Sequence, residues 1–217
     1  AKWFHLSGIT PAISAAAAAV SLDAVRAARA QGLTVSCDYN FRANLWRWGK
    51  RAPEVMRDIM QYVDVGIAGR EDCQRALGVS DDASGADDAA EPDPERYRAL
   101  ASRVLEAFPT LQMQVITLRS SHSATQNGWS ACLLDHASFH VSRRYEICDI
   151  VDRVGAGDAF SAGLIYELLE RGDPALALEF ATAAACLKHT IPGDVNRVSV
   201  AEVQALMDGD RGGRVQR

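Results

Sequence analysis

Short apolar, β-branched runs alternate with longer segments of helical periodicity along the first half of the chain. The short runs predict strands at residues 2–7, 33–37, 63–68 and 113–118, and the longer segments predict helices at 11–31, 53–62, 70–78 and 95–108. In the first helix, four side chains are expected to face inward: Ile13, Val20, Val25 and Ala28. Gly32 then stops that helix. Strands and helices that alternate at this spacing imply an α/β fold, with a parallel sheet covered by helices on both faces.

In the second half of the chain, the strict alternation of strands and helices ends. Residues 129–134 and 138–142 predict a hairpin of antiparallel strands at a sheet edge. Helices are expected at 155–171, 174–189 and 199–207, followed by a flexible tail at 208–217. Because ligands of parallel α/β sheets bind beyond the carboxyl ends of the strands, chemistry is expected in the polar loops 7–8, 38–42 and 68–71.

Composition and charge narrow the kind of ligand. The chain of 217 residues is long enough for one core, and its net charge of −5 leaves no basic surplus to follow a nucleic-acid backbone. No run of about 18 apolar residues occurs, so we expect no membrane-spanning helix. A small molecule is therefore the expected ligand.

Cysteine usage indicates the compartment. The number of cysteines is odd, and their spacing forms neither a C-x-x-C pair nor a zinc pattern. Reduced, buried thiols in a cytoplasmic protein are therefore expected. The cysteines are Cys37, Cys73, Cys132, Cys148 and Cys186.

Residues 80–95 contain seven acidic side chains and no basic one. These acids lack the alternating register, central glycine and terminal glutamate of an EF-hand calcium loop. A solvated acidic insertion on the surface is therefore predicted, and no function is assigned to it.

The segment Gly155-Ala156-Gly157-Asp158 carries the clearest chemical pattern. Gly155 and Gly157 let the backbone approach a ligand closely, immediately before a helix whose first N–H groups have no partner within the helix. Such a helix start favours an anion by about 0.3–2 kcal/mol before any directed hydrogen bond is counted.

Asp158 has two interpretations. An acid in the first turn of a helix is favoured by the helix dipole, and this would suffice for an isolated motif. A carboxylate beside a phosphate site can also orient an attacking hydroxyl group and accept its proton late in phosphoryl transfer.

Residues 155–163, with the sequence GAGDAFSAG, resemble the C-terminal motif of the ribokinase-like (phosphofructokinase B) family of sugar kinases. The resemblance implies a doubly wound α/β domain with a small β-sheet lid, which phosphorylates a sugar hydroxyl with ATP and Mg²⁺. Further segments resemble the 2-keto-3-deoxygluconate kinases of that family: residues 5–9, 38–42 with 45–46, 117–119 with 127–129, and 188–194.

The resemblance implies roles for particular residues. Asp158 would be the catalytic base, and Gly155, Ala156 and Gly157 would form the anion hole for the γ-phosphoryl group. The substrate would be bound by Arg42, Asp158 and Asp194, and Glu71 would contact Mg²⁺ through water. Nucleotide contacts are expected at Ala68, Thr117, Arg119, Ser121, Ser123, Gly155, Gly157 and Thr182.

Several positions depart from the family pattern. The usual Asn-x-x-Glu motif reads Ala68-Gly-Arg-Glu71, Arg153 replaces a small hydroxyl residue, and Thr182 stands where many members have Asn. The Gly-Gly substrate motif and the lid strands do not occur before Lys2. We therefore expect residues 1–217 to be the C-terminal two-thirds of one kinase domain, lacking the N-terminal strands and the lid.

The sequence thus predicts an ATP-dependent kinase that converts 2-keto-3-deoxygluconate into its 6-phosphate. A ribokinase-like or fructokinase-like enzyme is one alternative, which Arg42 disfavours because a neutral sugar needs no such donor. A non-catalytic nucleotide-binding fragment is another. A Rossmann dehydrogenase is disfavoured because Gly155 opens a late helix rather than the one after the first strand. The full-length protein could form a homo-oligomer.

Overall fold

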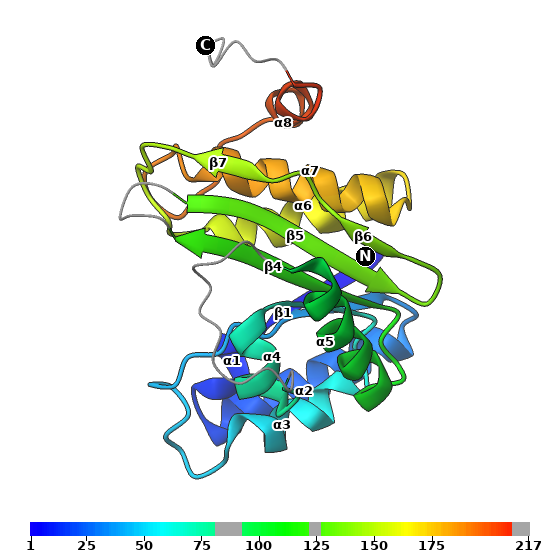
Figure 1. Cartoon of the computed structure of the whole chain (residues 1–217). Helices are drawn as coiled ribbons and strands as arrows, with labels where there is room; N and C mark the ends of the chain where they lie inside the picture. Colours follow the sequence, from blue (N-terminus) through cyan, green and yellow to red (C-terminus); the bar gives the residue numbers. More distant parts are fainter. Residues whose placement is uncertain (81–92, 122–126, 210–217) are drawn as a thin grey trace. The chain divides into compact units, whose positions relative to one another are not determined.

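The structure is a computed structural model that describes residues 1–80, 93–121 and 127–209 (Figure 1). By their contacts, these residues divide into two compact units. The first unit holds the described residues between Ala1 and Thr117, together with Leu133–Phe139. The second holds the described residues of Leu118–Cys132 and those from His140 onward. The strands pair in the order β1-β2-β3-β4-β5-β6, with β7 beside β5.

Parallel strands form the framework of the first unit. They are β1 (Trp3–Ser7), β2 (Thr34–Asp38), β3 (Val65–Gly69) and the start of β4 (Met113–Ser121). Four successive residues of β3, from Val65 to Ala68, are buried. Because successive side chains point to opposite faces of a sheet, both faces of β3 are covered, as a parallel α/β sheet requires. The predicted α/β class is confirmed.

The helices of the first unit occur where the sequence predicts them, with one correction. They are α1 (Ile9–Ala12), α2 (Ala15–Ala30), α3 (Ala52–Met60), α4 (Arg70–Leu77) and α5 (Pro94–Ala107). The single helix predicted at 11–31 is wrong, because Ser14 interrupts it in an extended conformation and its side chain caps α2 at the amide of Ala17. Gly32 and Gly78 follow their helices with positive φ, as predicted for stops.

The break at Ser14 also corrects the predicted inward face. Ile13 and Val20 are 58% and 65% exposed, whereas Val25 and Ala28 are buried. The buried positions of α2 are Ala18, Ser21, Val25 and Ala28. This spacing of three and four residues defines one helical face, and Val20 lies off it.

The second unit contains the remaining strands and helices. They are β5 (Asn127–Asp135), β6 (Phe139–Val141), β7 (Tyr145–Ile147), α6 (Ala156–Glu170), α7 (Pro174–Lys188) and α8 (Val200–Met207). The sequence did not predict β7, which pairs antiparallel with the start of β5. The sheet is therefore mixed, with parallel β1 to β4 and an antiparallel strand beside β5.

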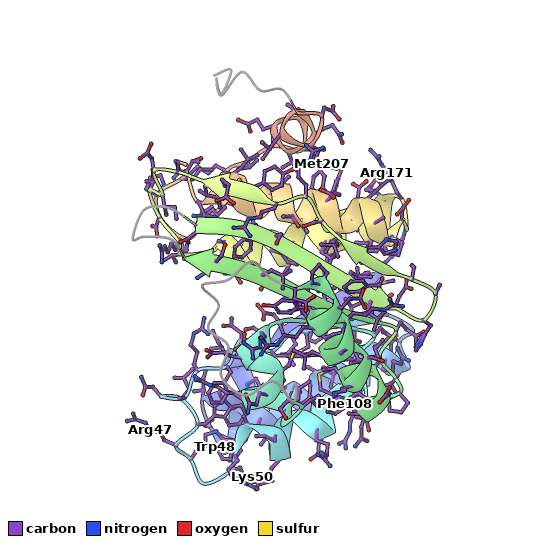
Figure 2. All side chains as sticks on the ribbon, in the orientation of Figure 1. Arg47, Trp48, Lys50, Phe108, Arg171 and Met207 are labelled. Atoms are coloured by element: carbon purple, nitrogen blue, oxygen red, sulfur yellow. The ribbon has the colours of Figure 1, made fainter. Side chains whose placement is uncertain are left out.

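Close packing of α6 on α7 gives the second unit its core. A Cβ at Gly163 of α6 would lie 3.1 Å from the Cα of Ala181, so a small residue permits this approach. A second apolar cluster, Tyr145, Phe180, Ala183, Ala184 and Val203, joins β7, α7 and α8. Met207 near the end of α8 packs against this cluster (Figure 2).

Two predicted segments lie largely outside the described residues. Residues 81–92 hold most of the acidic insertion, and residues 210–217 hold most of the tail. Within the part of the chain that is described, no helix is long and apolar enough to cross a membrane. All the cysteines lie in described residues, and none forms a disulfide there.

Candidate active site

The N-terminus of α6 forms the predicted glycine cradle in the second unit. Gly155 is the N-cap residue with φ of 80°, a left-handed conformation that side chains other than glycine rarely adopt. A Cβ at Gly155 would also overlap the carbonyl oxygen of Asp194. Two independent reasons therefore require glycine at this position: the positive φ and the close contact with Asp194. Because Gly155 has no side chain, the backbone of Asp194 can lie against the cradle.

The first turn of α6 carries the proposed acid. Asp158 lies in that turn, and Gly157 offers open space where a Cβ would stand, with no described atom within 4 Å. The Ala159 amide donates to the carbonyl of Gly155 at 2.9 Å, which closes the first helical bond. Before it, the amides of Gly157 and Asp158 have no partner within the helix and can donate to an anion. The amide of Ala156 donates instead to the carbonyl of Arg153 at 3.4 Å.

Asp152 fixes the two backbone segments that meet at this helix start. Its carboxylate accepts hydrogen bonds from the amides of Val154, at 2.9 Å, and Gly193, at 2.8 Å. These backbone hydrogen bonds lower the pKa of Asp152, because they stabilise the charged form. Asp152 was not predicted as a site residue, although it lies three residues before Gly155.

Two guanidinium groups lie in the same unit around a buried aromatic cluster. Arg119 stands over the ring of Trp129, with 5.3 Å between its Cζ and the ring centroid, and His189 packs edge-on against the same ring at 5.4 Å. Arg153 donates to the Oδ1 of Asn127 at 3.3 Å. Burial and the nearby charge of Arg153 both lower the pKa of Arg119.

This cluster is suited to an anion. Among the described residues, the Nδ2 of Asn127, the Nε1 of Trp129 and the Nε2 of His189 are buried without a hydrogen-bond partner. A bound anion would relieve the repulsion between the guanidinium groups of Arg119 and Arg153. The phosphate-neutralising role of Arg119 stays a prediction.

The loop after β2 in the first unit carries the predicted carboxylate-binding arginine. Arg42 is exposed, and its Nη1 donates to the carbonyl of Phe41 at 2.9 Å, which leaves its other N–H groups toward solvent. The same loop carries Arg47, Trp48 and Lys50 (Figure 2). Its basic residues give the loop a positive charge, which favours an anionic ligand.

Asp72 anchors this loop and was missed by the sequence analysis. Its carboxylate accepts from the amide of Phe41 at 3.1 Å and from the amide of Gly69 at 3.2 Å. Asp72 therefore joins the residue before Arg42 to the start of α4. Burial is the main reason that the pKa of Asp72 is raised, because desolvation disfavours the carboxylate.

Glu71 was the predicted magnesium contact. Its side chain is 66% exposed and pairs with Arg75 at 3.1 Å along α4. Among the described residues no group of three His, Cys, Asp or Glu side chains could hold a metal ion. Because the Glu71 carboxylate is exposed and oxygen is the ligand that Mg²⁺ prefers, it could reach such an ion through water, and this contact stays a prediction.

The remaining predicted nucleotide contacts differ in accessibility. Thr117 donates to the carbonyl of buried Ala68 at 3.4 Å, which brings these two residues together. Ser121 is the last residue of β4, and Ser123 lies outside the described residues. Thr182 is fully buried within α7, and its hydroxyl donates to the carbonyl of Leu178 at 2.7 Å. Thr182 thus packs inside α7, and its predicted nucleotide contact stays a prediction.

The helix start with Asp158 in its first turn, on an α/β fold, is the local arrangement that the sequence motif predicts. Residues 1–199 match the pfkB family carbohydrate kinases. The chain belongs to this family, as the sequence motif predicted.

Individual relatives agree with this assignment. A 2-dehydro-3-deoxygalactonokinase of Haloferax volcanii is 27% identical over 97% of this chain and 58% of its own length. The crystal structure of a 2-dehydro-3-deoxygluconokinase from Thermotoga maritima has a TM-score of 0.85 and 43% identity, over 96% of this chain and 61% of that one. A PfkB family carbohydrate kinase from Listeria grayi has a TM-score of 0.81 and 28% identity, over 95% of this chain and 60% of that one. The chain thus spans about three-fifths of the length of these relatives.

Proposed function

We propose that the protein transfers the γ-phosphoryl group of ATP to the 6-hydroxyl of 2-keto-3-deoxygluconate, giving the 6-phosphate and ADP. The observation that carries the proposal is the glycine N-cap of α6 with Asp158 in its first turn. The 43% identity to the Thermotoga maritima structure, which is named a 2-dehydro-3-deoxygluconokinase, supports this substrate class.

In the proposed reaction, Asp158 orients the attacking hydroxyl group and accepts its proton as the bond to phosphorus forms. The amides of Gly157 and Asp158 at the start of α6 stabilise the negative charge on the transferred group, with the helix dipole adding to their effect. Arg119 and Arg153, which are exposed beside the buried Trp129 and Asn127, neutralise phosphate charge. When bound, Mg²⁺ would offset the negative charge of the ATP phosphates. Glu71 would hold that ion through water.

The sugar acid would be recognised by its charge. Arg42 has guanidinium N–H groups free of the Phe41 carbonyl, and a planar donor of this kind can bind a carboxylate with two hydrogen bonds. Asp194, whose backbone contacts Gly155, would bind hydroxyl groups of the sugar. ATP and the sugar acid are the partners that the proposal needs. The proposal includes a cytoplasmic location, where ATP is available.

A galactonate-derived keto acid is the second candidate substrate. The Haloferax volcanii relative, 27% identical, is named a 2-dehydro-3-deoxygalactonokinase. The gluconate- and galactonate-derived keto acids differ in the stereochemistry of one hydroxyl group, while their carboxylates are the same. Arg42 would therefore serve both, and the choice depends on which groups face that hydroxyl.

The proposal is tested by ADP release in the presence of ATP and Mg²⁺, with an intact-mass check of the protein used. The panel consists of both keto acids, gluconate, ribose and fructose. Turnover with 2-keto-3-deoxygluconate well above that with ribose and fructose is expected. Preference for the galactonate-derived acid would replace the substrate, and preference for a neutral sugar would overturn the sugar-acid assignment. Binding of ATP without turnover on any sugar would identify a nucleotide-binding fragment.

A further inference from the structure

Lys188 is a charged residue that the proposed reaction does not use, yet its side chain is completely buried. It is the last residue of α7 and has 0% exposure. Transfer of an ammonium group from water into a protein interior is costly unless oxygen atoms replace the lost water. Oxygen acceptors must therefore lie close to the ammonium group of Lys188.

Two backbone carbonyl groups supply those oxygen atoms. The Nζ of Lys188 donates to the carbonyl of Ile191 at 3.0 Å and to that of Gly193 at 2.6 Å. Both carbonyls belong to the turn that follows α7. The amide of Ile191 donates back to the carbonyl of Lys188 at 3.1 Å, so the turn folds around the end of the lysine side chain.

The opposite side of the turn is held by a negative charge. The carboxylate of Asp152 accepts from the amide of Gly193, and the charge of Lys188 helps to lower the pKa of Asp152. Gly193 is therefore bound at its carbonyl by an ammonium group and at its amide by a carboxylate. The next residue, Asp194, has its carbonyl packed where a Cβ of Gly155 would stand.

We propose that Lys188 is a positioning residue for the start of α6, acting as a built-in cation that holds turn 190–194 against Gly155. Asp152 links this turn to the segment from Asp152 to Gly155, because its carboxylate accepts hydrogen bonds from both. Loss of the ammonium group would leave the carbonyls of Ile191 and Gly193 unsatisfied and let the turn move from the cradle. The catalytic consequence of this role rests on the proposed kinase function, whereas the structural consequence does not.

The test uses Lys188→Ala and Lys188→Met, with Lys2→Ala at the exposed N-terminal segment as the matched control. Amide hydrogen exchange is measured at Val154 and Gly193, and at Val203 in α8 as an internal reference. Exchange at Val154 and Gly193 is expected to be at least about tenfold faster in both variants, because a hydrogen-bonded charge is lost. Methylammonium can enter the space left in Lys188→Ala and is expected to restore protection of these amides from exchange. Tetramethylammonium is larger and has no N–H, so it is not expected to restore protection.

Unchanged exchange in both variants, or equal restoration by tetramethylammonium, would overturn the proposal. A measurement on the unsubstituted protein guards against variants that do not fold. Acetylation of its lysines is followed by mass spectrometry, and Lys188 is expected to react far more slowly than Lys2 and Lys50. Equal reaction rates at all three would also overturn the proposal.

Kinetics distinguish positioning from general stability. Where the unsubstituted protein turns over, Lys188→Ala is expected to lower kcat by about 100-fold, with KM for the keto acid nearly unchanged and kcat recovered by methylammonium. A rise in KM alone, without recovery, would contradict the positioning role. Absence of turnover in the unsubstituted protein would count against the proposed function, and the exchange experiment would still decide the role of Lys188.

Discussion

At the scale of single residues, Gly155 is a position where two separate constraints exclude a side chain. It combines a positive φ with a neighbouring carbonyl of Asp194, whereas Gly193 has the same φ of 80° and no described atom within 4 Å of a Cβ. Gly193→Ala is expected to cost about 1–2 kcal/mol, the usual penalty of left-handed backbone. Gly155→Ala should cost clearly more, because the methyl group must also displace the turn. Urea unfolding of the two variants checks this, and equal losses would contradict the packing of Asp194 on Gly155.

Arg42 is expected to act on the substrate's charge alone. In Arg42→Ala, KM for the keto acid should rise by about tenfold or more, since a charge-assisted hydrogen bond contributes about 1.5–3 kcal/mol. KM for ATP should stay constant. Arg47→Ala, in the same loop, is the matched control. A similar rise in KM for a neutral sugar would show that Arg42 supports the loop instead of binding a carboxylate.

At the scale of elements, the break between α1 and α2 depends on one hydroxyl group. Ser14 accepts the amide hydrogen of Ala17 at 3.1 Å as the N-cap of α2. Ser14→Ala is expected to lower the free energy of unfolding by about 1 kcal/mol, and Ser14→Asn should be nearly neutral because asparagine caps equally well. Thermal or urea unfolding measures both. Equal stability of the alanine variant and the unsubstituted protein would mean that the cap contributes nothing.

Elements that depend on local sequence were predicted, and those that depend on distant contacts were not. The glycines at 155 and 157 identify the start of α6, since a helix N-cap is encoded within a few residues. The three residues of β7 carry too short a pattern and become a strand only by pairing with Asn127–Trp129 of β5. The sequence predicts Ser14 inside a helix because a run of alanines, residues 15–19, follows it.

The candidate site shows the same division. Asp158 and its glycines could be predicted because the chemistry lies in one contiguous motif. Asp72 and Lys188 could not, because their roles depend on amides and carbonyls that only the folded chain brings to them. The burial of Thr182 could not be predicted from the sequence, because it follows from the packing of α7.

At the scale of the whole molecule, buried His189 makes stability depend on pH. Its Nδ1 lies 2.7 Å from the carbonyl of Ala185, and burial, with the nearby charges of Arg119, Arg153 and Lys188, lowers its pKa. The folded protein therefore holds His189 neutral, while the unfolded chain takes up a proton near pH 6.5. The contribution is fully present above about pH 6.5 and is lost as the pH falls toward the lower folded pKa.

The unsubstituted protein is thus expected to lose stability between about pH 7 and pH 5 more steeply than His189→Gln does. His136→Gln, at an exposed turn, should follow the unsubstituted curve. Urea unfolding at a series of pH values provides the comparison. Parallel curves for all three proteins would show that His189 does not hold a lowered pKa in the fold.

The most direct test of the central claim follows the phosphoryl group itself. The protein is incubated with ATP, Mg²⁺ and 2-keto-3-deoxygluconate, and phosphorus NMR identifies the product ester, with Asp158→Asn and the exposed control Asp23→Asn in parallel. We predict a phosphate ester at the 6-hydroxyl, formed at an equal rate by Asp23→Asn and about 10²–10⁴-fold more slowly by Asp158→Asn. An ester formed equally fast without the carboxylate of Asp158, or no sugar ester from a protein that hydrolyses ATP, would contradict the account.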